Sequence, residues 1–282
     1  MISMNGRHKL LQTVLHLVLI IMAISTVAPL VFLMFNSFKS NNEIVASPIA
    51  LPKEWSFEYI ANAIDKINFI GALGVTFMIT FCSIALLVLV SSFSAWAMVR
   101  SKSVVSNIMF MCCTAAMLIP FQSLMYPLLD IFEKLGLKNV GGLVLMYGGF
   151  GLSMSVFLYH GFIKSVPASL EEAAFIDGAN LFQMFFKVEF PLLKGTTVTV
   201  IVLNGMWIWN DYLLPFLVVG NKEGFKTLTL ELYFAKLTSG QYGNPWELIF
   251  PAVFITIIPI ILLYIVLQKY IVAGVTDGAI KM

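Results

Sequence analysis

Six long stretches of the sequence carry almost no charged side chain, and this spacing constrains the fold more than any other feature. A bilayer hydrocarbon core about 30 Å thick is crossed by about 20 helical residues, so each stretch is long enough to span it. Membrane-spanning strands would instead be short alternating segments of about 10 residues. The sequence therefore predicts an all-α polytopic membrane protein with six transmembrane helices, between Lys9 and Lys39, Lys66 and Arg100, Lys102 and Asp130, Lys138 and Lys164, Lys194 and Lys222 (interrupted only by Asp211), and Glu247 and Lys269.

The composition excludes several classes of protein. Only 11% of the residues are charged, whereas a soluble domain has about 25%, so a water-soluble globular fold is excluded. The 17 Lys and Arg are nearly balanced by 15 Asp and Glu, which leaves no basic surface for nucleic acid. With no low-complexity linker and no second soluble region, we expect one membrane domain over residues 1–282.

The flanking charges predict the topology. The first apolar run, residues 14–35, is too long for a signal peptide and lacks a small-residue cleavage site after it, so we expect it to be retained. An even number of spans places both termini on one side, and the basic N-terminus with Arg7 and Lys9 indicates the cytoplasm. Residues 36–68 and 220–247 are then outer loops, and residues 165–195 form a cytoplasmic loop.

A search for catalytic or metal-binding patterns finds little. Cys82, Cys112 and Cys113 lie within spans and lack metal-ligand spacing, and no HExxH pattern or carboxylate pair occurs within a span. Residues 220–227, GNKEGFKT, depart from the spacing of a phosphate-binding loop. Two alternatives remain open: a secondary carrier, which needs ionisable groups in the membrane, and a membrane-embedded enzyme, which needs a nucleophile and a base on facing helices.

The predicted cytoplasmic loop carries the clearest local pattern. Ser169 and Glu172 have the spacing of a capping box after Pro167, and Gly178 suits the end of the helix that they begin. A second short helix, rich in Phe, should stop at Pro191. Because membrane-surface helices are usually basic and this one begins with acidic residues, docking into the groove of a partner protein is favoured.

These residues resemble a known motif. Glu172-Ala173-Ala174, Gly178 four residues later, and residues 188–191 after nine more resemble the EAA loop of ATP-binding-cassette importer permeases. Further matches extend over nearly the whole chain, and they resemble the carbohydrate-uptake permeases, specifically the second, six-span subunit of the maltose importer. They include Ser37-Phe38-Lys39, Pro120, Trp209-Asn210-Asp211 with Pro215, and Gln268-Lys269-Tyr270 with Gly278.

The resemblance implies a type I importer permease fold and a non-catalytic permease subunit of an ATP-driven sugar importer in the bacterial inner or plasma membrane. The substrate would be a di- or oligosaccharide. The implied partners are a second homologous permease that completes a heterodimer, two copies of a cytoplasmic ATP-binding subunit, and an extracellular or periplasmic sugar-binding protein. No cofactor is expected on this chain, since ATP and Mg would be used by the ATPase.

Three sets of site residues follow from the resemblance. The ATPase-coupling loop would use Ser169, Glu171, Glu172, Ala173, Ala174, Asp177, Gly178 and Pro191. Contact with the binding protein would fall to Tyr233, Lys236, Gln241, Tyr242, Asn244 and Trp246. Candidate residues for the translocation path are Trp207, Trp209, Asn210 and Asp211, although anchoring of a helix end at the membrane interface is the favoured interpretation of these four.

Overall fold

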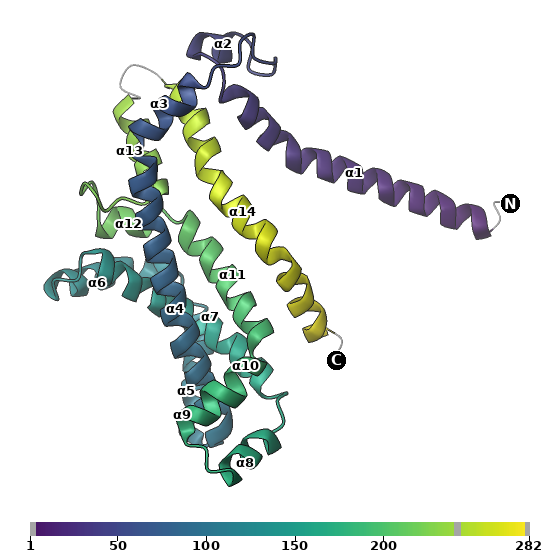
Figure 1. Cartoon of the computed structure of the whole chain (residues 1–282), viewed down its shortest axis with the longest axis vertical. Helices are drawn as coiled ribbons and strands as arrows, with labels where there is room; N and C mark the ends of the chain where they lie inside the picture. Colours follow the sequence, from purple (N-terminus) through teal and green to yellow (C-terminus); the bar gives the residue numbers. More distant parts are fainter. Residues whose placement is uncertain (1–3, 240–243, 280–282) are drawn as a thin grey trace. The chain divides into compact units, whose positions relative to one another are not determined.

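The computed structural model describes residues 4–239 and 244–279, and no strand occurs within these ranges (Figure 1). The all-α prediction is confirmed. The elements are α1 Met4–Asn36, α2 Asn41–Ala46, α3 Glu58–Lys66, α4 Phe69–Ser101, α5 Val104–Ala116, α6 Phe121–Lys134, α7 Val140–Ile163, α8 Ser169–Ile176, α9 Leu181–Gln183, a π-helical turn Met184–Glu189, α10 Phe190–Leu192, α11 Lys194–Asn210, α12 Leu213–Val218, α13 Leu228–Ser239 and α14 Trp246–Ala279.

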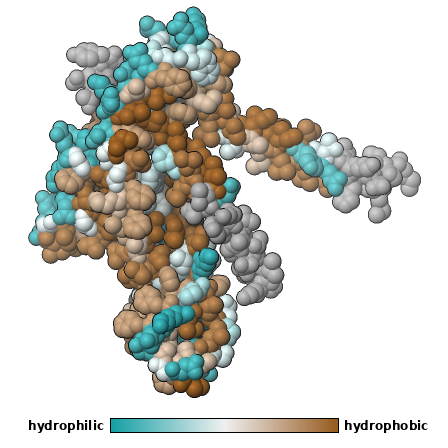
Figure 2. Space-filling model, in the orientation of Figure 1, coloured by the Kyte–Doolittle hydropathy of each residue, from teal (hydrophilic) through white to brown (hydrophobic). Residues whose placement is uncertain are grey.

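Among the described residues, four helices are long and apolar enough to cross a membrane. They include Leu11–Asn36 of α1, all of α4 and α7, and Trp246–Ile265 of α14. Many of their large apolar side chains point outward, among them Phe77, which is 61% exposed, and the space-filling view shows hydrophobic side chains over much of the surface (Figure 2). In water such a surface would be strongly unfavourable, so these faces fit a lipid environment or a partner protein.

The other two charge-free runs are interrupted rather than continuous. Helices α5 and α6 meet at a bend of 106°, and as one broken span they would make a fifth crossing. Pro120 caps the start of α6, and it forces the bend because proline has no N–H and disfavours helical backbone in the residue before it. Helix α11 ends after 17 residues, where Asp211 takes an extended backbone. Six transmembrane helices were predicted, and the described residues contain four long apolar helices, or five spans if α5 and α6 count as one.

The chain separates into two compact units, residues 1–69 with 232–258 and residues 70–231 with 259–282. In the first unit, α3 packs Ala63 and Ile67 against Ala252 and Ile255 of α14. The buried Lys39 ammonium donates to the Asn36 side chain and to the Ser47 and Pro48 carbonyls at 3.2 to 3.3 Å, which fixes the chain after α1.

The two predicted outer loops are more ordered than expected. Residues 36–68 contain α2 and α3. Residues 220–247 contain the 12-residue helix α13. The sequence interpretation treated both as loops because their charges and prolines ended the apolar runs. Polar helices lack the long apolar signal on which that interpretation depended.

In the second unit, α4, α7 and α11 pack closely around small and polar residues. A Cβ on Gly151 would lie 2.6 Å from Asn204 Oδ1 and 2.7 Å from Leu87 Cδ1, so any side chain there would have to displace both of these side chains. The Asn204 amide donates to Ser155 Oγ at 3.1 Å and to the Val200 carbonyl at 2.9 Å. This polar contact joins α7 to α11 where the backbones come close. The same unit carries α8 to α10 at one end of these helices (Figure 1).

Candidate functional site

The loop of residues 165–195 forms the candidate site, and its first helix begins one residue earlier than predicted. Ala168 caps α8, and its carbonyl accepts from the N–H groups of both Glu171 and Glu172 at 3.0 Å. Ser169 is already helical, and no side-chain bond caps the helix. The predicted capping box of Ser169 and Glu172 is therefore wrong, because a residue inside the first turn cannot act as the cap.

Gly178 makes the predicted elbow. Its φ is +83°, in the left-handed region. The N–H of Ala179 bonds to the Ala174 carbonyl at 2.9 Å, and that of Gly178 bonds to the Phe175 carbonyl at 3.0 Å. These two bonds form a Schellman motif, in which glycine is favoured because it has no Cβ to oppose a positive φ. The prediction that Gly178 ends the helix is confirmed.

The second arm of the loop begins with a capping box that the sequence analysis missed. Asn180 Oδ1 accepts from the Gln183 N–H, and Gln183 Oε1 accepts from the Asn180 N–H, both at 2.9 Å. The spacing of Asn and Gln three residues apart could have predicted this start. The arm continues through the π-helical turn, which precedes Pro191, and ends at Leu192, one residue beyond the predicted stop. Since proline cannot donate, the regular helical pattern cannot be kept at this point.

The two arms present an apolar surface around the elbow. Phe175 and Ile176, at the end of α8, are 70% and 83% exposed, and Leu181 and Phe182 are exposed on the next arm. Glu172, Ala173 and Asp177 are also exposed, whereas Ala174 packs against the buried core beneath the loop. A cluster of large exposed apolar side chains beside two carboxylates is typical of a surface that docks a protein partner.

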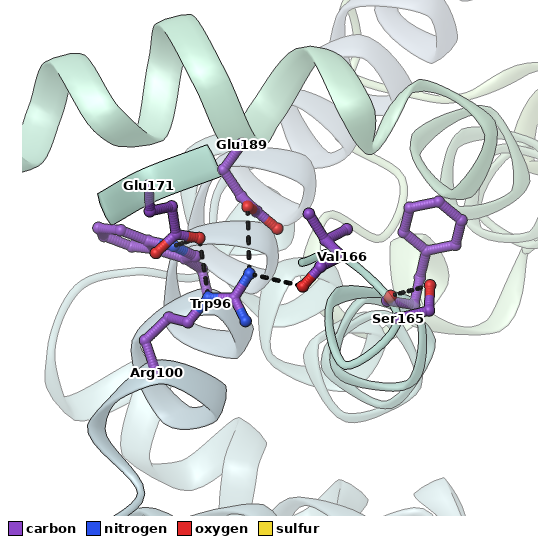
Figure 3. Close-up of polar contacts among 7 residues, drawn as sticks. Trp96, Arg100, Ser165, Val166, Glu171 and Glu189 are labelled. Carbon is purple, nitrogen blue, oxygen red and sulfur yellow. Dashed lines mark hydrogen bonds and ion pairs between the residues drawn. The ribbon is translucent and has the colours of Figure 1, made fainter. Parts of the chain in front are cut away.

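Glu171 points the other way, into a polar network at the end of α4 (Figure 3). Its Oε1 accepts from Trp96 Nε1 at 3.0 Å and from Arg100 Nε at 2.8 Å. Arg100 Nη2 also donates to the Val166 carbonyl at 3.2 Å and lies 3.5 Å from Glu189 Oε2. Glu171 was predicted as a residue of the ATPase-coupling loop. Its carboxylate is buried within the chain, so it is not part of the exposed surface of that loop.

The two carboxyl groups of this network differ in their electrostatics. Burial raises the pKa of Glu171, but the neighbouring Glu189 carboxyl and the hydrogen bonds from Arg100 and Trp96 outweigh it and hold the pKa below its ordinary value. Burial, together with the Glu171 carboxylate, raises the pKa of Glu189 to about 7. Neither Glu189 oxygen has a hydrogen-bond partner among the described residues. Arg100 therefore forms its main ion pair with Glu171.

Sequence reasoning did not find this network. Arg100 served only to mark the end of a charge-free run, and Trp96 and Glu189 were not considered as site residues. The Arg100 to Glu171 bond joins positions 71 residues apart, so no local spacing could indicate it. Only the packing of α8 beneath the end of α4 brings these side chains together.

The candidate translocation residues at the end of α11 do not form one cluster. Asp211 Oδ2 accepts from Tyr147 Oη at 2.9 Å, and its Oδ1 accepts from the Leu213 N–H at 3.0 Å. Asp211 thereby bridges the turn between α11 and α12, whose cap residue is Tyr212. Trp207 and Asn210 are exposed, whereas Trp209 is buried. Tyr147 is a partner that the sequence analysis missed.

The residues predicted to contact a binding protein are only partly described. Tyr233 and Lys236 lie on α13, where Lys236 is exposed, and Asn244 is exposed before α14. The Trp246 N–H donates to Asn41 Oδ1 at 3.2 Å, which joins α2 to α14 within the first unit. Gln241 and Tyr242 lie outside the described residues. Over residues 4–239 and 244–279, no three His, Cys, Asp or Glu side chains gather to suit a metal ion.

Comparisons with known proteins agree with this architecture. A family model described as "Binding-protein-dependent transport system inner membrane component" matches residues 88–277. The probable starch degradation products transport system permease AmyC of Thermoanaerobacterium thermosulfurigenes is 41% identical, covering 93% of this chain and 94% of its own. The multiple sugar-binding transport system permease MsmG of Streptococcus mutans is 35% identical, with coverage of 90% and 91%.

A third relative and a solved structure extend the comparison. The diacetylchitobiose uptake system permease NgcG of Streptomyces coelicolor is 31% identical over 94% of this chain and 88% of its own. A crystal structure of a bacterial ABC transporter involved in importing alginate contains a chain with the same fold, at a TM-score of 0.81, 23% identity and coverage of 96% and 99%. The chain belongs to the family of inner-membrane components of binding-protein-dependent transport systems, whose members are non-catalytic permease subunits of ATP-binding-cassette importers.

Proposed function

We propose that this chain is one half of the translocation pathway of an ATP-driven sugar importer. A second homologous permease would complete the pathway, two copies of a cytoplasmic ATP-binding subunit would drive it with ATP and Mg, and a sugar-binding protein would deliver the substrate. Relatives named for starch degradation products, multiple sugars and diacetylchitobiose support a di- or oligosaccharide as the substrate. Uptake of a panel of labelled oligosaccharides by cells with and without the gene identifies the substrate.

The observation that carries the coupling role is the surface of the 165–195 loop. Phe175 and Ile176 stand exposed at a rigid elbow, with the Glu172 carboxylate beside them. Exposed apolar anchors with a charged neighbour form the common core of protein interfaces, where a few residues provide most of the binding energy. We infer that this surface enters a groove on the ATPase, so that closure of the ATPase pair moves the loop.

The test of this role separates the charge of Glu172 from its helical position. Because α8 is capped by Ala168, Glu172→Gln removes only a charge, and Ile176→Ala removes an exposed anchor. We expect each to lower the amount of ATPase that co-purifies with a tagged permease, on the order of tenfold for the anchor, and to lower sugar uptake. Ser169→Ala is the matched control, since Ser169 is exposed and makes no capping bond. Full retention of ATPase by both variants would refute the docking surface.

The proposed topology has both termini and the 165–195 loop in the cytoplasm, with the chain in the bacterial cell membrane. Arg100, which lies between the second and third charge-free runs and is inside in this topology, contacts the loop through Glu171. Single cysteines at Asp177 and Asn244, both exposed, are introduced after removal of the three native cysteines. An impermeant thiol reagent applied to intact cells should label position 244 and spare position 177. The reverse pattern would invert the topology.

We also propose that residues 220–247 contact the sugar-binding protein. Lys236 and Asn244 are exposed, as a contact surface requires. Shortening residues 239–244 should lower ATPase stimulation by the sugar-loaded binding protein while the transporter still assembles. Unchanged stimulation would remove this role from the segment.

The residues at the end of α11 divide into two roles. Asp211 accepts from the Leu213 N–H at the start of α12 and from Tyr147 Oη of α7, so we propose that it holds the helix ends together. Trp207 is exposed and packs edge-on against Tyr147 at a ring distance of 5.5 Å, and an exposed aromatic face can stack on a sugar ring. Trp207→Ala should raise the KM for sugar uptake, whereas Trp207→Phe should keep it near that of the native protein.

A further inference from the structure

We propose that Arg100 is a positioning residue that links the 165–195 loop to membrane helix α4, so that movement of the loop is passed directly to α4. This inference rests on the proposed coupling role of the loop. It adds a route by which movement enters the membrane helices. The residues concerned lie within one compact unit, and they are drawn together in Figure 3.

The first support is the number of points at which one guanidinium holds the loop. Arg100 bonds to Val166, just before α8, and to Glu171 within α8, and it pairs with Glu189 at the end of the π-helical turn. These three positions lie on both arms of the elbow and on its entry segment. A planar guanidinium has several fixed donors, so Arg100 can bond to Glu171 and Val166 at once while it lies beside the Glu189 carboxyl, which a lysine ammonium on a flexible stem does less well.

The second support is that α4 contributes two donors to one carboxylate oxygen. Trp96 and Arg100 are four residues apart and therefore lie on the same helix face. Both donate to Oε1 of Glu171, at 3.0 and 2.8 Å. The Trp96 ring also contacts Phe185 of the second arm, with ring centroids 5.4 Å apart. Displacement of α8 along or across α4 would break both bonds, so the two helices must move together.

The third support is burial. The Arg100 side chain is 20% exposed, Glu171 is 11% exposed and Glu189 is fully buried. Pairs shielded in this way are weakly screened, and removal of one partner leaves an uncompensated charge. Surface pairs on flexible side chains could not transmit a displacement, because solvent would replace them readily. The burial therefore favours a mechanical role over a solvated ion pair.

The two adjacent carboxylates of α8, Glu171 and Glu172, lie on different faces of the helix and have different proposed roles. Glu172 is exposed beside the proposed ATPase surface, whereas Glu171 is turned to α4. The helix thus has one face for the partner and one for the membrane helix. Loss of the inward contact should leave ATPase binding intact and disconnect it from transport. Loss of the outward contact should remove the ATPase itself.

The experiment uses the whole transporter, purified from its own membrane through a tag on this chain and reconstituted in vesicles. Arg100→Met removes the polar contacts while keeping an unbranched apolar stem. We expect sugar uptake per ATP hydrolysed to fall on the order of tenfold, with the ATPase retained at the native ratio. Lys102→Met is the matched control, because Lys102 is an exposed cation two residues away, and it should transport normally.

Three results would overturn the inference. Native uptake per ATP in Arg100→Met would show that the contact transmits nothing, and loss of the ATPase in that variant would show that Arg100 only maintains the loop. If Arg100→Met does not assemble, Trp96→Phe replaces it as the test, because it removes the N–H that donates to Glu171 and keeps an aromatic ring beside Phe185. Native coupling in this variant would also overturn the inference.

Failure of the proposed function has a different signature. If the 165–195 loop does not bind the ATPase, Ile176→Ala and Gly178→Val will retain both the ATPase and transport. If only the inference about Arg100 fails, these two variants will lose the ATPase while Arg100→Met remains coupled. The two ideas can therefore be rejected separately with the same purified material.

Discussion

A graded series of substitutions at Gly178 tests whether the backbone conformation of the elbow is what the ATPase contact requires. A Cβ added to Gly178 would meet no atom within 4 Å, so a new side chain has room within the chain. The cost comes from φ, which is +83°. An L-residue in the left-handed region costs roughly 1–2 kcal/mol, while asparagine tolerates it best and β-branched residues least.

These costs translate into measurable losses. About 1.4 kcal/mol is a tenfold change in an equilibrium constant, so Gly178→Ala should reduce the population of the correct elbow by roughly that factor. Co-purified ATPase and sugar uptake should fall in the order Gly, Asn, Ala, Val. Gly195→Ala is the control, because Gly195 is exposed in the first turn of α11, has ordinary φ and has no neighbour within 4 Å of an added Cβ. It should behave as the native protein.

The relative losses in the Asn, Ala and Val variants of Gly178 show whether the backbone conformation is the requirement. If asparagine is as harmful as valine, the partner rejects any side chain at this position and the backbone argument is wrong. If all three variants retain the ATPase and transport, the elbow is not needed for docking. Only a graded loss with asparagine mildest supports a conformational requirement.

Two further predictions concern packing and pH. Gly151→Ala should destabilise the protein by about 1–3 kcal/mol and lower its Tm, since its Cβ would lie 2.6 Å from Asn204 Oδ1. Gly149→Ala is the control, because an added Cβ has open space at this position of the same helix. Equal Tm values for the two variants would contradict the prediction. Because folding raises the pKa of Glu189 from 4.5 to about 7, its contribution to stability is present below pH 4.5 and lost as the pH rises through about 7. Glu189→Gln should remove this part of the pH dependence of Tm, and an unchanged dependence would refute the assignment.

The features that depend on local sequence were predicted well. Charge-free runs indicated membrane helices because apolar length is a property of consecutive residues, and four of the runs are continuous helices. The Gly178 elbow was also predictable, since a positive φ at a helix end favours glycine. The bend at Pro120 carried a local signal as well, and it was outweighed by the unbroken apolar composition around it.

The features that depend on packing were not predictable. The start of α8 at Ser169 differs by one residue from the predicted start, and that shift decides whether Ser169 caps the helix. The contact of Arg100 with Glu171 joins distant positions, and a sequence shows only that both are charged. Membrane helices in particular conceal such contacts, because apolar residues face both lipid and core and so give no sign of which face is buried.

The most direct test of the central claim is a cross-link from the tip of the loop in the intact transporter. A photoreactive amino acid replaces Ile176, which is 83% exposed at the end of α8, and the control replaces Phe77, which is 61% exposed on α4. Irradiation in native membranes, followed by mass spectrometry of the adducts, should join position 176 to an ATP-binding-cassette subunit, with no such adduct from position 77. If position 176 yields only lipid adducts, or if both positions capture the ATPase equally, the 165–195 loop is not the site that couples this permease to ATP hydrolysis.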